Sequence, residues 1–218
     1  MASVDTRTLL GESFVELAQR VPFDKISVSD IVAASGKNRK TFYYHFDDKA
    51  ALVRWIFRND LAQRLEQRFP ADQLVFEKDS EGAIIEAPYY VLVKIGIRSL
   101  DGSLFFKTLA ETFEGRRSFY KQALASNDAG CLRSYLLKLY TPAIERDVRF
   151  MLSTRPLDDA SVRFLAQFYT IASIDYMTQR IMETDDEPLL KGTEVFENLI
   201  HFSLGQLILH QQLNRSSK

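Results

Sequence analysis

The sequence contains few of the residues that interrupt helices or cross-link chains. Among its 218 residues there are 9 glycines, 6 prolines and one cysteine, Cys131. A lone cysteine cannot form an internal disulfide and has no metal-ligand spacing, which fits a reducing cytoplasm. No run of about 18 apolar residues occurs, so we expect no membrane span. The first residues lack a long apolar core after a basic start, so we expect no signal peptide.

The sequence also has little excess charge. Its net charge is −1, so the composition gives no general indication of a nucleic-acid partner. A local basic patch is nevertheless present, because residues 37–40 hold three cations and no anion. Apolar residues make up 46% and charged residues 26% of the chain, which are ordinary proportions for a globular protein.

Apolar residues recur with the helical period along most of the chain, so we predict an all-α fold. The pattern predicts helices near residues 5–21, 28–34, 39–46, 48–69, 89–99, 103–114, 116–126, 129–153, 158–183 and 191–213. The period is lost in residues 70–88, where two apolar triplets flank a polar turn and predict either a small hairpin or a long loop. We expect a domain boundary there, with domains of residues 1–69 and 70–218.

Capping residues mark the ends of the N-terminal helices. Ser27 and Asp30 have the spacing of a capping box at the start of the second helix. Gly36 follows that helix and can adopt the left-handed conformation that a tight reversal requires. Asn38 can cap the third helix and Asp47 the fourth. A short capped helix, a glycine turn and a second short helix are the layout of a helix-turn-helix motif.

The third helix contains five consecutive aromatic rings in residues 42–46. At about 100° per residue, Phe42 and Phe46 share one side and are expected to face the core. An adjoining arc presents two cations and two phenols: Arg39, Lys40, Tyr43 and Tyr44. Such groups bind phosphates and base edges of DNA. The alternative is a small three-helix bundle with a solvated basic face, and the caps and turn favour DNA binding over it.

The stretch "ISVSDIVAASGKNRKTFYYHFDDKAAL" resembles the DNA-binding domain of TetR-family bacterial repressors. The residues that carry the resemblance are Ile26, Ile31, Ala34, Gly36, Thr41, Phe42, Tyr43, His45, Phe46, Lys49 and Leu52. Two further stretches, "RRSFYKQALASND" and "LRSYLLKLYTPAI", resemble a subgroup that contains a regulator of a dihydroxyacetone-kinase operon. The resemblance implies an N-terminal helix-turn-helix domain with its connecting helix and a larger C-terminal helical domain for effector binding and dimerisation.

The resemblance also implies roles for individual residues. Arg39 and Lys40 would read bases, and Tyr43 and Tyr44 would contact the DNA backbone or bases. Thr41, His45 and Lys49 would contact phosphates or orient their neighbours. The predicted DNA-binding set is completed by Ser27, Lys37 and Asn38. Three positions depart from the family pattern: Lys37 replaces a small apolar residue, Ser35 replaces alanine and Lys40 replaces glycine.

The last two predicted helices, residues 158–183 and 191–213, are apolar on more than one stripe. They are either fully buried in the monomer or form a four-helix dimer interface with a second copy. The resemblance favours a homodimer, because a two-fold axis places two recognition helices one DNA turn apart. The predicted interface residues are Phe168, Ile171, Phe202 and Leu209.

Residues 89–153 mix aromatic side chains with isolated polar groups, which suits a ligand cavity and suits an ordinary core equally well. The candidate pocket residues are Tyr90, Lys94, Arg98, Phe106, Glu111, Tyr135 and Tyr140. Nothing in the sequence identifies an effector.

Signals for catalysis are weak. His201 and His210 are nine residues apart and do not form an i, i+4 metal pair. The acidic run at residues 183–187 has no second acidic motif facing it, and we find no phosphate loop or nucleophile elbow. We therefore expect no enzyme, metal site or cofactor.

The sequence as a whole predicts a cytoplasmic homodimeric repressor that binds a palindromic DNA operator and is released by a small-molecule or protein effector. A protein–protein adaptor with the same fold is the second hypothesis, and an all-helical metal-dependent enzyme is the third.

Overall fold

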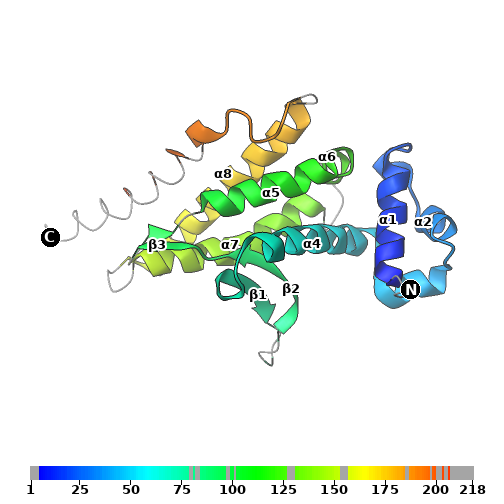
Figure 1. The fold of residues 1–218 in the computed structure, drawn as a ribbon, viewed down its shortest axis with the longest axis horizontal. Coiled ribbons are helices and arrows are strands. Elements are labelled where there is room, and N and C mark those ends of the chain that lie inside the picture. The colour runs from blue at the N-terminus through cyan, green and yellow to red at the C-terminus, as the bar shows by residue number, and fades with distance from the viewer. Residues whose placement is uncertain are drawn as a thin grey trace, which may run out of the picture.

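The computed structural model describes residues 5–78, 81, 84–96, 99–100, 102–126, 131–152, 157–184, 187–196, 198–199, 203 and 206. Helices dominate this part of the chain and confirm the all-α class (Figure 1). The helices are α1 (Thr6–Ala18), α2 (Val28–Ala34), α3 (Arg39–His45), α4 (Lys49–Arg68), α5 (Ser103–Gly115), α6 (Arg117–Ala125), α7 (Leu132–Leu152) and α8 (Asp159–Glu183). Two 3₁₀ turns, η1 (Phe23–Lys25) and η2 (Ala71–Gln73), precede α2 and the first strand.

The helices α1, α2 and α3 form a small bundle at one end of the molecule (Figure 1). Its core contains Leu10 and Phe14 from α1, Ile31 from α2 and Phe42 from α3, each with 0% of its surface exposed. These side chains recur at helical spacing on one face of each helix, so burying them fixes the three helices against one another.

The helix α4 connects this bundle to the rest of the chain. Leu52 and Ile56 in its first half belong to the N-terminal core. At the middle of the helix, the ring of Phe57 lies 5.9 Å from that of Phe113 on α5. The N-cap is Asp48, whose side chain accepts from the Ala51 amide, so the predicted cap at Asp47 was wrong by one residue.

A β-hairpin follows α4 and projects from one side of the molecule (Figure 1). Strand β1 (Leu74–Lys78) pairs antiparallel with β2 (Ile84–Val91), and Leu74 lies opposite Val91. Two shorter strands, β3 (Lys94–Gly96) and β4 (Ser99–Leu100), also pair. The hairpin alternative is confirmed, whereas the helix predicted near residues 89–99 was wrong. β2 instead buries three consecutive side chains, Tyr89, Tyr90 and Val91, and packs against α4.

The remaining helices form the body of the molecule. The helices predicted near residues 103–114, 116–126, 129–153 and 158–183 are confirmed as α5 to α8. The longest pair, α7 and α8, pack along each other, and Arg133 on α7 donates two hydrogen bonds to Asp175 on α8. Most of the helix predicted at residues 191–213 lies outside the described residues, although residues 194–196, 198–199, 203 and 206 are helical.

Candidate nucleic-acid interface

The start of α2 is fixed by the predicted capping box. The Ser27 hydroxyl oxygen accepts from the Asp30 amide at 3.3 Å, and the Asp30 carboxylate accepts from the Ser27 amide at 2.8 Å. The Ser27 hydroxyl also donates to that carboxylate at 2.6 Å. These hydrogen bonds lower the pKa of Asp30, because they favour its charged form. The exposed N-terminus of α2 is therefore firmly ordered.

The turn between α2 and α3 is built as the sequence predicts. Gly36 has a positive φ of 65°, and the following amide of Lys37 donates to the Val32 carbonyl at 2.9 Å. The Asn38 side chain then caps α3 by accepting from the Thr41 amide at 2.8 Å and from the Thr41 hydroxyl at 3.1 Å. Asn38 and Thr41 are thus held by each other, and α3 leaves the turn in a fixed direction.

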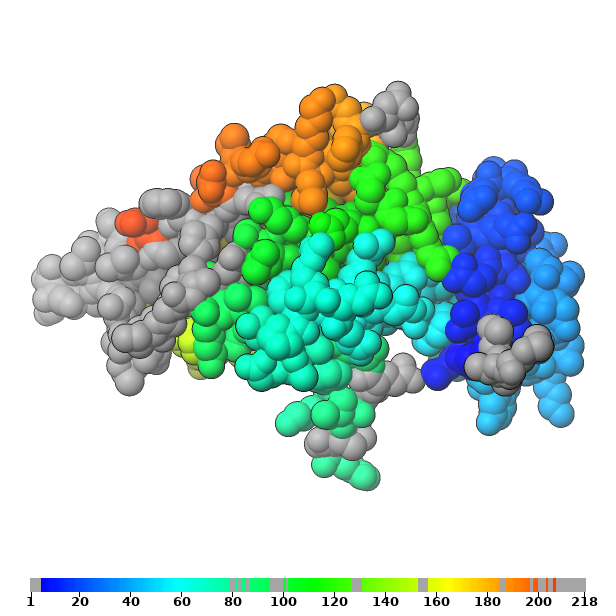
Figure 2. Space-filling view, in the orientation of Figure 1, coloured from blue at the N-terminus to red at the C-terminus, as the bar shows by residue number. Residues whose placement is uncertain are grey.

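The helix α3 separates its aromatic rings as the helical period requires. Phe42 is 0% exposed and Phe46 6%, whereas Tyr43 is 49% and Tyr44 83% exposed. The five-ring sequence therefore contributes two rings to the core and presents two phenols to solvent. Side chains of the segment near residue 40, in light blue, project from the N-terminal bundle in Figure 2.

The exposed face of α3 combines these phenols with cations. The Arg39 guanidinium lies 5.9 Å from the centre of the Tyr43 ring, and its hydrogen-bond partners, the hydroxyls of Ser29 and Tyr43, are 3.5 Å away. Such long contacts leave the guanidinium free to bind another acceptor. Lys40 is exposed beside it, while Lys37 and His45 are half-buried. The His45 ring packs edge-on against Tyr44 at 4.9 Å.

Lys49 differs from the other predicted DNA-binding residues because it points into the domain. Its ammonium donates to the carbonyls of Phe23 at 2.8 Å and Ile26 at 3.1 Å, and lies 5.0 Å from the centre of the Phe23 ring. These contacts join the start of α4 to η1 and to Ile26, which precedes the Ser27 cap of α2. Of the two roles that the resemblance implies for Lys49, the geometry supports the orientation of neighbours.

The sequence did not reveal how the N-terminal bundle is attached to α6. The Gln122 side chain accepts from the Phe23 amide at 2.8 Å and donates to the Ala18 carbonyl at 2.7 Å. The Phe119 ring lies 5.5 Å from Phe14 and 5.8 Å from Phe23. Because these partners are about a hundred residues apart in sequence, no local pattern could have indicated the contact.

Two of the four predicted dimer residues, Phe168 and Ile171, lie on an apolar stripe of α8 that faces solvent. Phe168 is 52% and Ile171 46% exposed, and Phe164 extends the stripe at 64%. The rings of Phe164 and Phe168 stack with centres 6.2 Å apart. The other two predicted interface residues, Phe202 and Leu209, lie outside the described residues.

The predicted pocket residues occupy several separate environments. Tyr90 and Tyr140 are buried together, with ring centres 6.2 Å apart. Phe106 packs against Phe196, 5.4 Å away, in a different contact. The remaining members have other partners or positions: Glu111 accepts from Arg68, Tyr135 accepts from Arg58, exposed Lys94 lies over the Phe150 ring, and Arg98 lies outside the described residues.

Sequence reasoning missed Asp147, which lies on α7 beside Tyr90. The Tyr90 hydroxyl donates to Asp147 Oδ2 at 2.6 Å. Burial raises the pKa of Asp147 to about 6 and raises that of Tyr90. Within the described part of the chain, Asp147 Oδ1 and the Tyr140 hydroxyl have no hydrogen-bond partner.

No group of three or more potential metal-ligating side chains is found among the residues that the structure describes. None of the helices formed by these residues is both long and apolar enough to cross a membrane.

The capped α2, the glycine turn and the cation-bearing α3 together define a helix-turn-helix DNA-binding protein. Residues 15–56 match the family model described as "Bacterial regulatory proteins, tetR family", and residues 103–202 match one described as "Transcriptional regulator C-terminal region". The chain belongs to the TetR family and is a DNA-binding transcriptional regulator.

One curated relative and one solved structure carry names with a regulatory meaning. The chain is 38% identical over 61 residues to the HTH-type dhaKLM operon transcriptional activator DhaS of Lactococcus lactis subsp. lactis (strain IL1403). That match covers 28% of this chain and spans only 33% of the relative's length. A solved structure of the dihydroxyacetone kinase operon activator DhaS has a TM-score of 0.51 and 18% identity, and covers 96% of this chain and 97% of that chain. This second likeness shows the fold.

Proposed function

We propose that this TetR-family regulator binds a palindromic operator as a homodimer in the cytoplasm and represses transcription by occupying that operator. The observation that carries the proposal is the exposed face of α3, where Arg39 and Lys40 stand beside Tyr43 and Tyr44. Guanidinium and ammonium groups bind guanine edges and phosphates in the major groove, and phenol hydroxyls donate to phosphates. The ordered N-terminus of α2, with Ser27, suits contact with the phosphate backbone.

The exposed stripe of α8 supports the homodimer. Phe164, Phe168 and Ile171 form a continuous apolar surface, and soluble monomers seldom leave a large surface of this kind open to water. A two-fold axis covers the stripe with its own copy and repeats the recognition helix at a fixed distance. Val195 and Leu199 are further exposed apolar residues, at 79% and 61%.

We propose that an effector, either a small molecule or a protein, releases the operator. The buried cluster of Tyr90, Tyr140 and Asp147 supports this, because two of its polar atoms have no partner among the described residues. Buried polar atoms without hydrogen-bond partners are uncommon and destabilising. A polar ligand that supplied those partners would therefore be stabilised in this cluster.

Activation is a second candidate for the direction of control. The observation that favours it is that the relative 38% identical over 61 residues is named a transcriptional activator. Transcription of a reporter from the bound promoter, with and without the protein, decides between the two directions.

Selection from a random duplex library tests the function itself. A dimeric regulator should enrich an imperfect palindrome whose half-sites are one DNA turn apart. Failure to enrich any duplex at low salt under reducing conditions would favour the protein–protein adaptor over the DNA-binding regulator. Turnover of a substrate that depends on an added divalent metal would favour the enzyme.

A further inference from the structure

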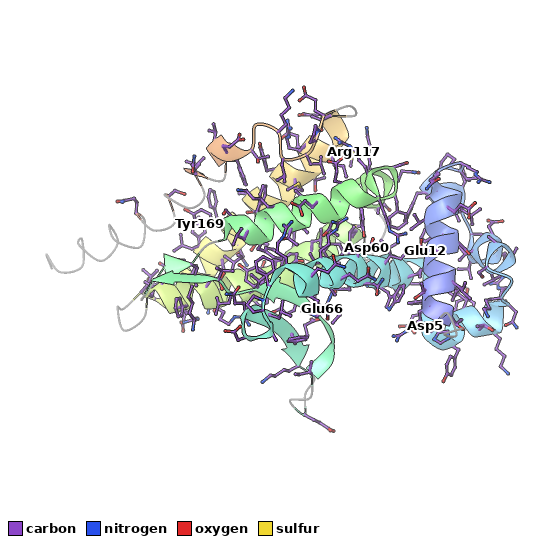
Figure 3. All side chains as sticks on the ribbon, viewed as in Figure 1. Asp5, Glu12, Asp60, Glu66, Arg117 and Tyr169 are labelled. Carbon is purple, nitrogen blue, oxygen red and sulfur yellow. The ribbon has the colours of Figure 1, made fainter. Side chains whose placement is uncertain are left out.

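A polar hollow of about 290 Å³ lies where α4 meets the junction of α5 and α6, close to α1. Its α4 side is one helical stripe, with residues at i, i+3, i+4 and i+7. The lining residues are Asp60, Gln63, Arg64, Gln67, Thr112, Gly115 and Arg116. Figure 3 labels Asp60 on α4 and Glu12 on α1, the two helices that meet near this hollow. None of the seven was predicted as a site residue.

Two of the charged groups at the hollow already have partners. The Asp60 carboxylate accepts from the Tyr120 hydroxyl at 2.6 Å and from Arg116 Nε at 3.0 Å. The other two nitrogens of the Arg116 guanidinium donate to the Glu12 carboxylate, at 3.0 and 2.5 Å. Arg116 therefore bridges α1 and α4, and its contact with Glu12 is on the solvent side because Glu12 is 57% exposed.

Arg64 is held less firmly than Arg116, because it acts on the nearby Asp60 carboxylate only through its charge. Its guanidinium forms no ion pair or hydrogen bond within the described part of the chain, although it is only half-exposed. It reaches across to α5, where a Cβ on Gly115 would come within 2.5 Å of Arg64 Nη2. The absence of a side chain at Gly115 thus leaves room for the guanidinium, which stands beside two exposed carboxamides, Gln63 and Gln67.

We propose that this hollow is a binding site for a small oxyanion, either a phosphate or a carboxylate, held by Arg64 and Arg116. A guanidinium presents a planar fork of N–H donors that matches both anions, and the carboxamides of Gln63 and Gln67 can supply further donors. A volume of about 290 Å³ suits a small anion and lies at the lower end of ligand pockets.

Binding would affect the position of the helix-turn-helix domain. An oxyanion that engages Arg116 competes with Glu12 for the same N–H donors, so it weakens the ion pair that ties α1 to α4. The regulatory meaning of this change rests on the proposed function, because it deepens the proposal that an effector controls operator binding. The binding itself can be measured without DNA, so a failure of either proposal is distinguishable from a failure of the other.

Titration calorimetry of the full chain at constant ionic strength, with inorganic phosphate in one arm and succinate in the other, tests the site. Saturable binding of one probe is expected, and the probe that binds identifies the class of anion. Trp55, the single tryptophan, provides a second readout, because its ring lies 3.0 Å from where a Cβ on Gly11 of α1 would be. Its fluorescence should change as the anion binds and α1 shifts.

Three variants make the test specific. Arg64→Gln should weaken the binding of the anion about 10- to 100-fold, because it removes the charged donor. Glu12→Gln should tighten the binding of the anion about two- to fivefold, because it removes the carboxylate that competes for Arg116. Arg20→Gln is the matched control: it removes the same charge just after α1, at an exposed ion pair with Glu16, and should leave the affinity unchanged.

Each result supports or overturns a separate part of the proposal. Weaker binding in Arg64→Gln together with tighter binding in Glu12→Gln supports it. The absence of saturable binding of both probes, or equal binding by Arg64→Gln and the wild-type chain, overturns the site. Binding that leaves Trp55 fluorescence unchanged overturns the competition with Glu12. Thermal unfolding of each variant shows whether weaker binding comes from a failure to fold.

Discussion

The N-terminal helix-turn-helix bundle and the C-terminal helical body both expose aromatic side chains, but in different chemical surroundings. On α3, Tyr43 and Tyr44 stand beside the cations Arg39 and Lys40. On α8, the exposed rings are those of Phe164 and Phe168, which stack on each other. A phenol beside a cation suits a hydrated, polyanionic partner such as DNA. Stacked phenyl rings are stabilised most when an apolar surface covers them.

The two regions also treat buried polar groups differently. Every buried side-chain nitrogen or oxygen without a partner, among the described residues, lies at residue 58 or beyond. The N-terminal bundle instead satisfies its helix caps locally, as Ser27 with Asp30 and Asn38 with Thr41 show, and Gln122 satisfies the Phe23 amide. A surface that must meet DNA in one geometry benefits from such rigidity. In the body, a bound ligand could supply the hydrogen-bond partners that the unsatisfied groups lack.

The largest expected effect is on the apolar surface of α8. Phe168→Glu places a charge in the proposed interface, which should cost several kcal/mol of dimer stability. The variant should sediment as a monomer and lose operator affinity although α3 is unchanged. Phe168→Leu, which keeps the surface apolar, should remain a dimer. A dimeric Phe168→Glu with unaltered DNA binding would place the interface elsewhere.

The buried carboxyl of Asp147 should make the stability of the body depend on pH. Because its pKa in the folded chain is about 6, above the unfolded value, the folded state binds more protons between about pH 4 and pH 6. The free energy of unfolding should therefore fall by about 2–3 kcal/mol as the pH rises through that window.

Asp147→Asn cannot ionise and still offers Tyr90 an acceptor. Its urea-unfolding free energy should stay flat over the same range, after allowance for the other titrating groups that both proteins share. A wild-type chain and variant with parallel pH profiles would show that Asp147 does not carry this dependence.

The exposed face of α3 should carry base preference. Arg39→Ala should cost about 1–3 kcal/mol on the preferred operator and relax selection at one base position. Arg20→Ala, which removes an exposed cation just after α1, is the control and should leave that base preference intact. Competition gel shifts with operators varied one base pair at a time measure both effects.

Lys49 tests whether an inward-pointing cation of this bundle serves folding or DNA binding. Lys49→Met keeps the stem but removes the hydrogen bonds to the Phe23 and Ile26 carbonyls, so we expect stability to fall by about 1–2 kcal/mol. The slope of operator affinity against salt concentration should not change. A slope lower by about one unit would instead indicate that the lysine binds a phosphate in the complex.

The N-terminal bundle was predictable because its signals are local. Ser27, Gly36 and Asn38 act within a few residues of their positions, and the burial of Phe42 and Phe46 follows from helical spacing. Lys49 was less predictable, since its acceptors lie 23 and 26 residues away. Gln122 was not predictable at all, because its partners, Phe23 and Ala18, lie 99 and 104 residues earlier in the chain.

The region after α4 was mispredicted for a different reason. The aromatic and apolar content of the run that begins at Tyr89 favours a helix. Its alternation of branched residues at Val91, Val93 and Ile95 has the period of a strand, and the structure places these residues in or beside β2 and β3. The burial of Tyr90 depends on packing against other elements, which the local pattern does not contain.

The smallest effects are expected from a pair of substitutions that compares the two exposed aromatic surfaces directly. Tyr44→Phe removes one hydroxyl from a side chain that is 83% exposed, so folding stability should stay within about 0.5 kcal/mol. Operator affinity should fall by about 0.5–1.5 kcal/mol if the hydroxyl donates to a phosphate. The reciprocal change on α8, Phe164→Tyr, adds a hydroxyl to a side chain that is 64% exposed, so it should cost the dimer little and leave operator affinity unaltered. Fluorescence anisotropy on the operator and sedimentation of the free protein measure the two effects. If Tyr44→Phe binds as tightly as the wild-type chain, the phenols of α3 act through their rings, and the difference between the two surfaces lies in Arg39 and Lys40 alone.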